Sequence, residues 1–374
     1  MNAPTVLWRS NIGTSAYRPG LALAAGRVAF VAGNSLFLVD ARTGTLVASV
    51  RDDTALAARE PPVAGPDATF YFAGARVFAV DPQGGIVWQK PIYPGAWGDS
   101  AGTSALRLDP GGVLYFAADD GMLRALRAVD GQELWAREVG LTKGAPRWLG
   151  SGVGDTIFVE GVPHDTATGA PGGQPFVDGL PVVVGAALAS RLLLAGRLMD
   201  GGWGGAVALD RCGVPLWSPQ VPGRWGFGLV GPGENVLVRG RTPDGTSATY
   251  VYSGAGEPVT GPAEVRGLPN VFGRDGTLYT VDCEGETPGS MRLRAYGTDL
   301  ALRWELPLGR GCAWGGAVLD DRGVLFVARD RSFPDGVEVI AIQTRSPGTL
   351  DSSWPTLRHD ARGTGWLGQN EQSP

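Results

Sequence analysis

The stretch from Ser104 to Val139, SALRLDPGGVLYFAADDGMLRALRAVDGQELWAREV, predicts four short strands joined by tight turns. Apolar runs of about strand length are separated by Asp109-Pro110-Gly111-Gly112, by Asp119-Asp120-Gly121 and by Asp130-Gly131. An Asp-Gly pair favours a hairpin, because glycine adopts the positive φ that the tight turn requires. Leu134-Trp135 then opens the fourth run. The stretch therefore indicates one four-stranded antiparallel sheet.

Seven further copies of this unit can be aligned on it, and successive copies lie 35 to 49 residues apart. Their third strands end in similar phrases, at Val39-Asp40, Val80-Asp81, His164-Asp165, Leu209-Asp210, Val251-Tyr252, Ala295-Tyr296 and Ala341-Ile342. A period of that size with four strands per unit is typical of propeller blades. The sequence predicts an all-β chain in which residues 1–374 form a single eight-bladed β-propeller of four-stranded antiparallel blades.

Tryptophan recurs at one place in the unit, which suits a large flat side chain that fills the wedge between neighbouring blades. This structural role is predicted for Trp8, Trp88, Trp135, Trp217, Trp304 and Trp354. Trp8 precedes the first full unit, so we expect the N-terminal strand to complete the last blade, whose other strands come from residues 316–342. Such closure removes exposed strand edges.

These phrases resemble those of a known family. VDARTGTLV (39–47), VDPQGGIVW (80–88) and VDGQELW (129–135) are similar to the repeat phrase of pyrroloquinoline-quinone-type (PQQ-like) propellers, and SSWPTLRHDARGTGW (352–366) is similar to the phrase that ends many of them. The resemblance spans nearly the whole chain and is weaker in the fourth and sixth copies, which lack the tryptophan. It implies that residues 352–366 are a structural latch and that residues 367–374 are a flexible tail.

The PQQ-like family includes quinoprotein dehydrogenases, a propeller of the outer-membrane assembly machinery, and envelope proteins without an assigned activity, so the fold does not decide the function. The dehydrogenases carry two adjacent cysteines and this chain has no such pair, so no cofactor is expected. The two histidines, His164 and His359, give no zinc spacing, and the sequence contains no phosphate-binding loop or nucleophile elbow. We expect no bound metal and favour a binding role over an enzyme.

The composition of the chain limits which classes of partner and which compartments are expected. The formal net charge of −5 argues against nucleic acid, because phosphate binding requires a dense basic face. No run of 18 apolar residues predicts a membrane span. No signal peptide is apparent at the start of the sequence. The chain is therefore either cytoplasmic or a mature form with an added methionine.

One mouth of the propeller channel is a candidate ligand site. The loops that enter the inner strands and those that join second to third strands should gather there, and they are rich in arginine and aromatic residues that suit an anionic or aromatic ligand or a peptide. The alternative is that these aromatic side chains pack between blades and the arginines pair with aspartates. The candidate residues are Tyr17, Arg18, Trp97, Asp99, Arg147, Trp148, Arg224, Trp225, Phe227, Asp282, Glu284, Trp314, Arg329 and Asp330.

The three cysteines are Cys212, Cys283 and Cys312. The repeat register places Cys283 and Cys312 on loops of adjacent blades at the same mouth, which predicts a disulfide and an oxidising compartment. The alternative is three reduced thiols in a cytoplasmic protein. The leading interpretation is a monomeric, non-catalytic scaffold of the bacterial periplasm or cell surface that binds a protein or ligand. The second interpretation is an enzyme or small-molecule binder that uses the channel mouth.

Overall fold

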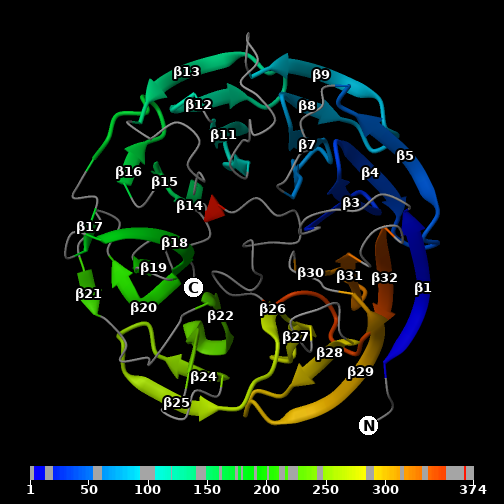
Figure 1. Cartoon of the computed structure of the whole chain (residues 1–374), viewed down its shortest axis with the longest axis vertical. Helices are drawn as coiled ribbons and strands as arrows, with labels where there is room; N and C mark the ends of the chain where they lie inside the picture. Colours follow the sequence, from blue (N-terminus) through cyan, green and yellow to red (C-terminus); the bar gives the residue numbers. More distant parts are fainter. Residues whose placement is uncertain are drawn as a thin grey trace.

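A computed structural model gives the three-dimensional structure of the chain. It describes residues 4–12, 20–53, 61–92, 106–118, 120–139, 149–159, 162–172, 176–177, 180–188, 192–199, 202–209, 215–217, 226–241, 247–283, 290–311, 316–330, 336–350 and 366–367. These residues form eight β-sheets arranged around a common centre (Figure 1). The helical structure in the described part is one short 3₁₀ turn, η1 (Pro232–Glu234). The predicted all-β class is confirmed.

The sheets follow the chain, and we number them in that order. Sheet 1 contains β2 (Leu21–Ala24), β3 (Arg27–Ala32), β4 (Ser35–Asp40) and β5 (Leu46–Arg51). Sheet 2 contains β6 (Val63–Ala64), β7 (Phe70–Ala73), β8 (Arg76–Val80) and β9 (Ile86–Pro91). Sheet 3 contains β10 (Arg107–Leu108), β11 (Val113–Ala117), β12 (Met122–Arg127) and β13 (Glu133–Glu138). Sheet 4 contains β14 (Leu149–Val153), β15 (Thr156–Val159), β16 (Val162–Asp165) and β33 (Trp366–Leu367).

The second half repeats this order with one longer sheet. Sheet 5 contains β17 (Phe176–Val177), β18 (Leu180–Leu188), β19 (Leu192–Met199), β20 (Gly202–Leu209) and β21 (Pro215–Trp217). Sheet 6 contains β22 (Gly226–Val230), β23 (Val236–Arg241), β24 (Ser247–Tyr252) and β25 (Pro258–Ala263). Sheet 7 contains β26 (Leu268–Phe272), β27 (Leu278–Cys283), β28 (Ser290–Tyr296) and β29 (Leu302–Arg310). Sheet 8 contains β30 (Ala317–Leu319), β31 (Val324–Asp330), β32 (Val337–Gln343) and β1 (Thr5–Ile12).

The first strand of the chain lies in the last sheet. β1 runs antiparallel to β32, from the pair Thr5–Gln343 to the pair Ile12–Val337, with one irregularity between Val6 and Trp8. The innermost strands of successive sheets lie beside one another, and β30 of sheet 8 lies beside β2 of sheet 1. The N-terminal strand therefore lies at the outer edge of sheet 8, beside β32, as the position of Trp8 in the sequence indicated.

Burial explains the two kinds of strand. The second and third strands of a sheet are covered on both faces by neighbouring sheets, so they are apolar along nearly their whole length. In β31 and β32 every residue except the last of each strand is buried. The outer strands keep an exposed face, and β9 alternates between exposed and half-buried residues.

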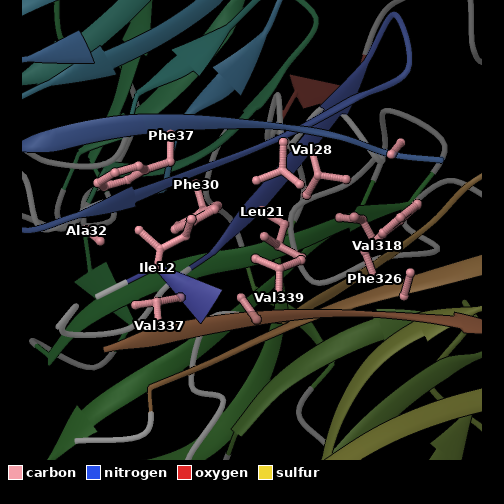
Figure 2. Close-up of a cluster of buried hydrophobic side chains, with 14 of the residues drawn as sticks. Ile12, Leu21, Val28, Phe30, Ala32, Phe37, Val318, Phe326, Val337 and Val339 are labelled. Carbon is pink, nitrogen blue, oxygen red and sulfur yellow. The ribbon is translucent and has the colours of Figure 1, made fainter. Parts of the chain in front are cut away.

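The hydrophobic core lies between sheets. Figure 2 shows one such cluster, in which Phe30 and Val28 of sheet 1 face Phe326 and Val339 of sheet 8, with Ile12 of β1 beside them. Further clusters of the same kind join sheets 1 and 2, 2 and 3, 3 and 4, 6 and 7, and 7 and 8. Sheets 1, 2, 3, 7 and 8 are therefore each packed against both of their neighbours.

Tryptophans of five outer strands connect a sheet to the next one along the chain, with sheet 8 followed by sheet 1. In four cases the indole N–H donates a hydrogen bond to a carbonyl in the turn that follows the third strand of the next sheet. The pairs are Trp8 with Ala41 at 3.2 Å, Trp88 with Ala128 at 2.8 Å, Trp135 with Thr166 at 2.9 Å, and Trp217 with Gly254 at 3.2 Å. Trp304 packs on the core between sheets 7 and 8, with its ring 5.9 Å from that of Tyr279. Trp354 lies outside the described residues.

A glycine in the turn makes this contact possible. Gly131 has a φ of +69°, and a Cβ on it would lie 2.7 Å from the indole of Trp88. Gly44 and Gly169 hold the same relation to Trp8 and Trp135. The glycine thus provides both the positive φ of the turn and the flat surface on which the tryptophan of the preceding sheet packs. We call this contact the Trp–Gly latch.

Candidate functional site

The candidate site is the rim where the inner strands begin and the second strands end. These ends lie on the same side of a sheet because adjacent antiparallel strands run in opposite directions. Phe227 is the second residue of β22, the inner strand of sheet 6. Asp282 and Cys283 are the last residues of β27, and Arg329 and Asp330 are the last residues of β31. These predicted residues all occupy the rim ends of their strands.

The other predicted rim residues lie outside the described residues, and so do two of the cysteines. The binding role of the rim and the disulfide between Cys283 and Cys312 therefore stay predictions. The residues concerned are Tyr17, Arg18, Trp97, Asp99, Arg147, Trp148, Cys212, Arg224, Trp225, Glu284, Cys312 and Trp314.

Arg329 is buried in an ion-pair network that joins three strands. Its Nε donates to Oε2 of Glu338 at 2.7 Å, and its Nη1 donates to the carbonyl of Arg310 at 2.6 Å. Arg9 of β1 donates to the same Glu338 oxygen at 3.0 Å and to the carbonyl of Leu308 at 3.2 Å. The side chains of Arg329 and Glu338 are 6% and 7% exposed. Arg329 therefore links β31 to β32 and to the end of β29. The sequence left open that rim arginines pair with aspartates, whereas Arg329 pairs with a glutamate.

Replacing Glu338 by glutamine should lower the free energy of unfolding by about 2 kcal/mol, the cost of weakening hydrogen bonds to a charged group at a buried position. Arg329 would keep its place but lose its counter-charge. Glu264→Gln is the matched control, because the pair between Glu264 and Arg266 is more than half exposed on both sides and should contribute less than about 1 kcal/mol. Chemical denaturation measures both. Equal losses for the two variants would contradict the assignment.

Similar charge clusters recur on other sheets. In sheet 7, Arg292 and Arg294 of β28 both donate to Glu305 of β29. The paired arginines lower the pKa of Glu305, against the effect of its partial burial, which is the largest single influence and raises that pKa. These clusters were not predicted from the sequence. The only available signal was an arginine and a glutamate facing each other on adjacent strands of the same unit.

A cavity of about 180 Å³ lies between sheets 2 and 3. Its charged side chains are coupled, with Lys90 Nζ 3.5 Å and Arg124 Nε 3.9 Å from Oε2 of Glu133. Pockets for small organic ligands usually measure ~300 to 1,000 Å³, so this cavity is small for such a ligand. Its walls are formed by Val77, Lys90, Pro91, Ile92, Phe116, Arg124, Leu126 and Glu133.

Other buried polar groups hold turns together. Asp52 is fully buried and accepts a hydrogen bond from the backbone N–H of Ala75 at 3.1 Å, while Asn34 donates to the carbonyl of Asp52 at 2.7 Å. Tyr115 donates to Asp109 at 3.0 Å, and burial raises the pKa of both groups. Burial, together with the charge of a nearby aspartate, likewise raises the pKa of Tyr71 to about 12. These groups serve the fold.

His164 is buried in β16, with Nδ1 3.1 Å from the carbonyl oxygen of Gly169. Burial lowers the pKa of His164 because the charged ring would lose its solvation, and the hydrogen bond to Gly169 opposes this only in part. Among the described residues, no three His, Cys, Asp or Glu side chains come together as a metal site would need.

The depressed pKa of His164 predicts a pH dependence of stability. The unfolded chain binds a proton on this ring near pH 6.5, where the folded chain does not, so stability falls as the pH drops through that value. We expect the unfolding midpoint of the native chain to fall more steeply from pH 7.5 to pH 5.5 than that of His164→Gln. Thermal unfolding at several pH values measures both slopes, and identical slopes would show that His164 has no such effect.

Comparisons with known proteins extend the description. Residues 2–162 match the family model described as outer membrane protein assembly factor BamB. Among solved structures, BamB from Moraxella catarrhalis is 15% identical with a TM-score of 0.43, and the alignment covers 92% of this chain and 98% of that one. The computationally designed Ika8 protein is 13% identical with a TM-score of 0.62, covering 89% and 98%. Saccharomyces cerevisiae Sqt1 is 12% identical with a TM-score of 0.62, covering 91% and 99%. No curated protein sequence matches the chain.

At these identities the Ika8 and Sqt1 structures support the fold alone. The family model covers β1 to β15, the part of the chain that contains the Trp–Gly latches of Trp8 and Trp88. No helix in the described part of the chain is long and apolar enough to cross a membrane. Over residues 2–162 the chain is therefore similar to the family of PQQ-like β-propeller repeats.

Proposed function

We propose that the chain is a closed eight-bladed PQQ-like propeller that acts as a non-catalytic protein-binding scaffold of the bacterial cell envelope. The observation that carries this proposal is the match of residues 2–162 to a family described as an outer membrane protein assembly factor. An assembly factor works by holding other proteins, and this requires a rigid surface more than a reactive one.

The arrangement of sheets supports closure of the propeller. The eight sheets of the described residues become eight blades if β1 serves as the outer strand of sheet 8. The contact between β30 and β2 places sheet 8 against sheet 1, and the cluster around Phe30 and Phe326 fills the space between them. A ring of this kind keeps its loops at fixed relative positions, which suits a scaffold.

The outer strands supply a surface for partners. Aliphatic side chains that are about half exposed lie on most of them, at or just before the tryptophan position, and so follow the perimeter seen in Figure 1. Scattered exposed aliphatic residues are ordinary, but their repetition on outer edge strands, whose backbone groups face outward, suits the docking of another polypeptide. They are Leu7, Leu46, Ile86, Val87, Leu134, Leu216, Val259 and Leu302.

The compartment follows from the same proposal. A scaffold of the envelope would act in the periplasm or at the cell surface as a monomer, and there Cys283 and Cys312 would be oxidised to a disulfide. Mass spectrometry of non-reduced peptides from protein taken from its native cells tests this. Two free thiols would contradict the disulfide and indicate a cytoplasmic protein.

Photo-crosslinking in native cells tests the scaffold role. A photoreactive amino acid is placed at Val87, which is 54% exposed on β9, and in a second variant at Val259, which is 52% exposed on β25. We expect a discrete protein adduct in the envelope fraction from at least one of them. Thr43, exposed in a turn on the opposite side from the rim, is the control position.

The competing function is binding or turnover of a small molecule at the rim. Two experiments test that alternative. One adds PQQ with Ca²⁺ and measures a shift in the absorbance of the quinone, and the other is a thermal-shift screen of small ligands. A ligand that raises the unfolding midpoint, together with no protein adduct at Val87 or Val259, would overturn the scaffold proposal.

A further inference from the structure

The C-terminal strand β33 pairs with the inner strand of sheet 4. Trp366 lies opposite Gly152 and Leu367 lies opposite Val153, in a parallel arrangement. The other strand pairs in the described part of the chain are antiparallel. Figure 1 shows β33 on the central side of β14, so β33 extends sheet 4 towards the channel.

The inner edge of β14 is suited to accept a strand. The innermost strand of a propeller sheet has one row of backbone N–H and C=O groups directed at the channel, and such a row is a template for another chain. β14 reads Leu149-Gly-Ser-Gly-Val153, and its ladder with β15 is irregular between Leu149 and Gly152. Glycine in a strand allows another backbone to approach closely. The added strand begins opposite one of these glycines.

The β33 pairing depends on its tether. Two residue pairs in a parallel ladder form few hydrogen bonds, and parallel pairing is slightly weaker per residue than antiparallel pairing. The chain is held again at Leu350, whose N–H donates to the carbonyl of Phe272 in sheet 7 at 2.9 Å. The 15 residues between Leu350 and Trp366 span at most roughly 55 Å. A tether of that length gives an effective concentration on the order of millimolar, so a weak strand occupies the edge in its own chain.

We propose that the channel edge of β14 is a binding site for an extended peptide, and that the C-terminal segment of this chain is its built-in occupant. A partner binds there as a parallel strand after displacing β33. This inference deepens the scaffold function proposed above, on which the existence of such a partner rests, by naming the chemistry of the partner segment as an extended strand with an apolar pair. The strand-accepting edge itself can be tested without any cellular partner.

The first test uses the full-length chain and a labelled peptide of residues 362–370, RGTGWLGQN. The variant Trp366→Pro/Leu367→Pro removes both backbone donors from the tail and should free the edge. We expect this variant to bind the peptide at least tenfold more tightly than the native chain, by fluorescence anisotropy. Gln369→Pro/Glu371→Pro is the matched control and should bind like the native chain. Equal binding by the native chain and the tail variant would overturn the proposal.

A second test examines the pairing of β33 with β14 while β33 still occupies the edge. In a chain whose three native cysteines are replaced by serine, Val153→Cys/Leu367→Cys should form an intramolecular disulfide on mild oxidation. Val230→Cys/Leu367→Cys, with Val230 at the equivalent end of inner strand β22, should not. A crosslink between two chains, or equal yields for the two pairs, would overturn the assignment of the tail to β14 of its own chain. If both tests succeed but photo-crosslinking in cells gives no protein adduct, the strand-accepting edge of β14 is established and the scaffold function is refuted.

Discussion

A chain that lacks residues 1–12 is expected to lose cooperative folding and to aggregate. The deletion removes β1, which pairs with β32 through seven residue pairs from Thr5 to Ile12. It also removes the indole of Trp8 from sheet 1 and one of the two arginines bound to Glu338. The cluster between sheets 8 and 1 loses Ile12, and the whole edge of β32 becomes available to other chains.

Size-exclusion chromatography and thermal unfolding measure this result. Deletion of residues 368–374, which follow β33, is the control, and it should leave the unfolding midpoint within about 1 °C of the native value because no described contact is lost. A synthetic peptide of residues 1–12 should restore a soluble monomer by filling the vacated edge. If the shortened chain unfolds at the native temperature, β1 does not hold the ring together.

Trp88→Ala is expected to lower the free energy of unfolding by about 3 kcal/mol, near the lower end for large aromatic truncations since the ring is only partly buried. The substitution removes the indole from Tyr71, whose ring lies 6.0 Å away, and leaves the Ala128 carbonyl without its 2.8 Å donor. Val87→Ala, one residue earlier and exposed, is the control, and should cost less than about 0.5 kcal/mol.

A double-mutant cycle with Gly131 tests the latch itself. Gly131→Ala should destabilise strongly on its own, because the added Cβ meets the indole and the backbone has a positive φ. In the Trp88→Ala background Gly131→Ala retains only the backbone cost. The losses of unfolding free energy in the two single variants should therefore sum to more than the loss in the double variant. Additive losses would show that Trp88 and Gly131 act independently.

The sequence predicted much of the fold because turns are local. Asp-Gly phrases and apolar runs specify each hairpin within about ten residues, so the strands of the unit between Ser104 and Val139 were expected within a few residues of β10 to β13. β12 ends at Arg127, ahead of the Asp130-Gly131 turn that the sequence indicated, because the N–H of Arg127 already bonds into the turn with the carbonyl of Gln132. The outer position of the tryptophans also followed from their place in the repeat.

The site was less predictable because its contacts join distant segments. Arg329 carried no local sign that it would meet Glu338 and the carbonyl of Arg310, and Arg9 reaches the same carboxylate from the other end of the chain. The pairing of β33 with β14 could not be predicted from the repeats, because residues 352–366 resemble a phrase that follows the last repeat and that phrase does not indicate a partner strand. Most of the predicted rim lies outside the described residues, so its ligand stays a prediction.

The pairing of β1 with β32 also sets an order for biosynthesis. Gln343 leaves the ribosome about 340 residues after its partner Thr5, which at usual translation rates is roughly 20 to 70 s later. Throughout that time the nascent chain carries a strand that includes Leu7 and Trp8 and has no partner. Slow codons between those for β1 and those for β32, or a shortage of chaperones that hold nascent chains, should therefore reduce the yield of this protein more than slow codons that precede those for β1.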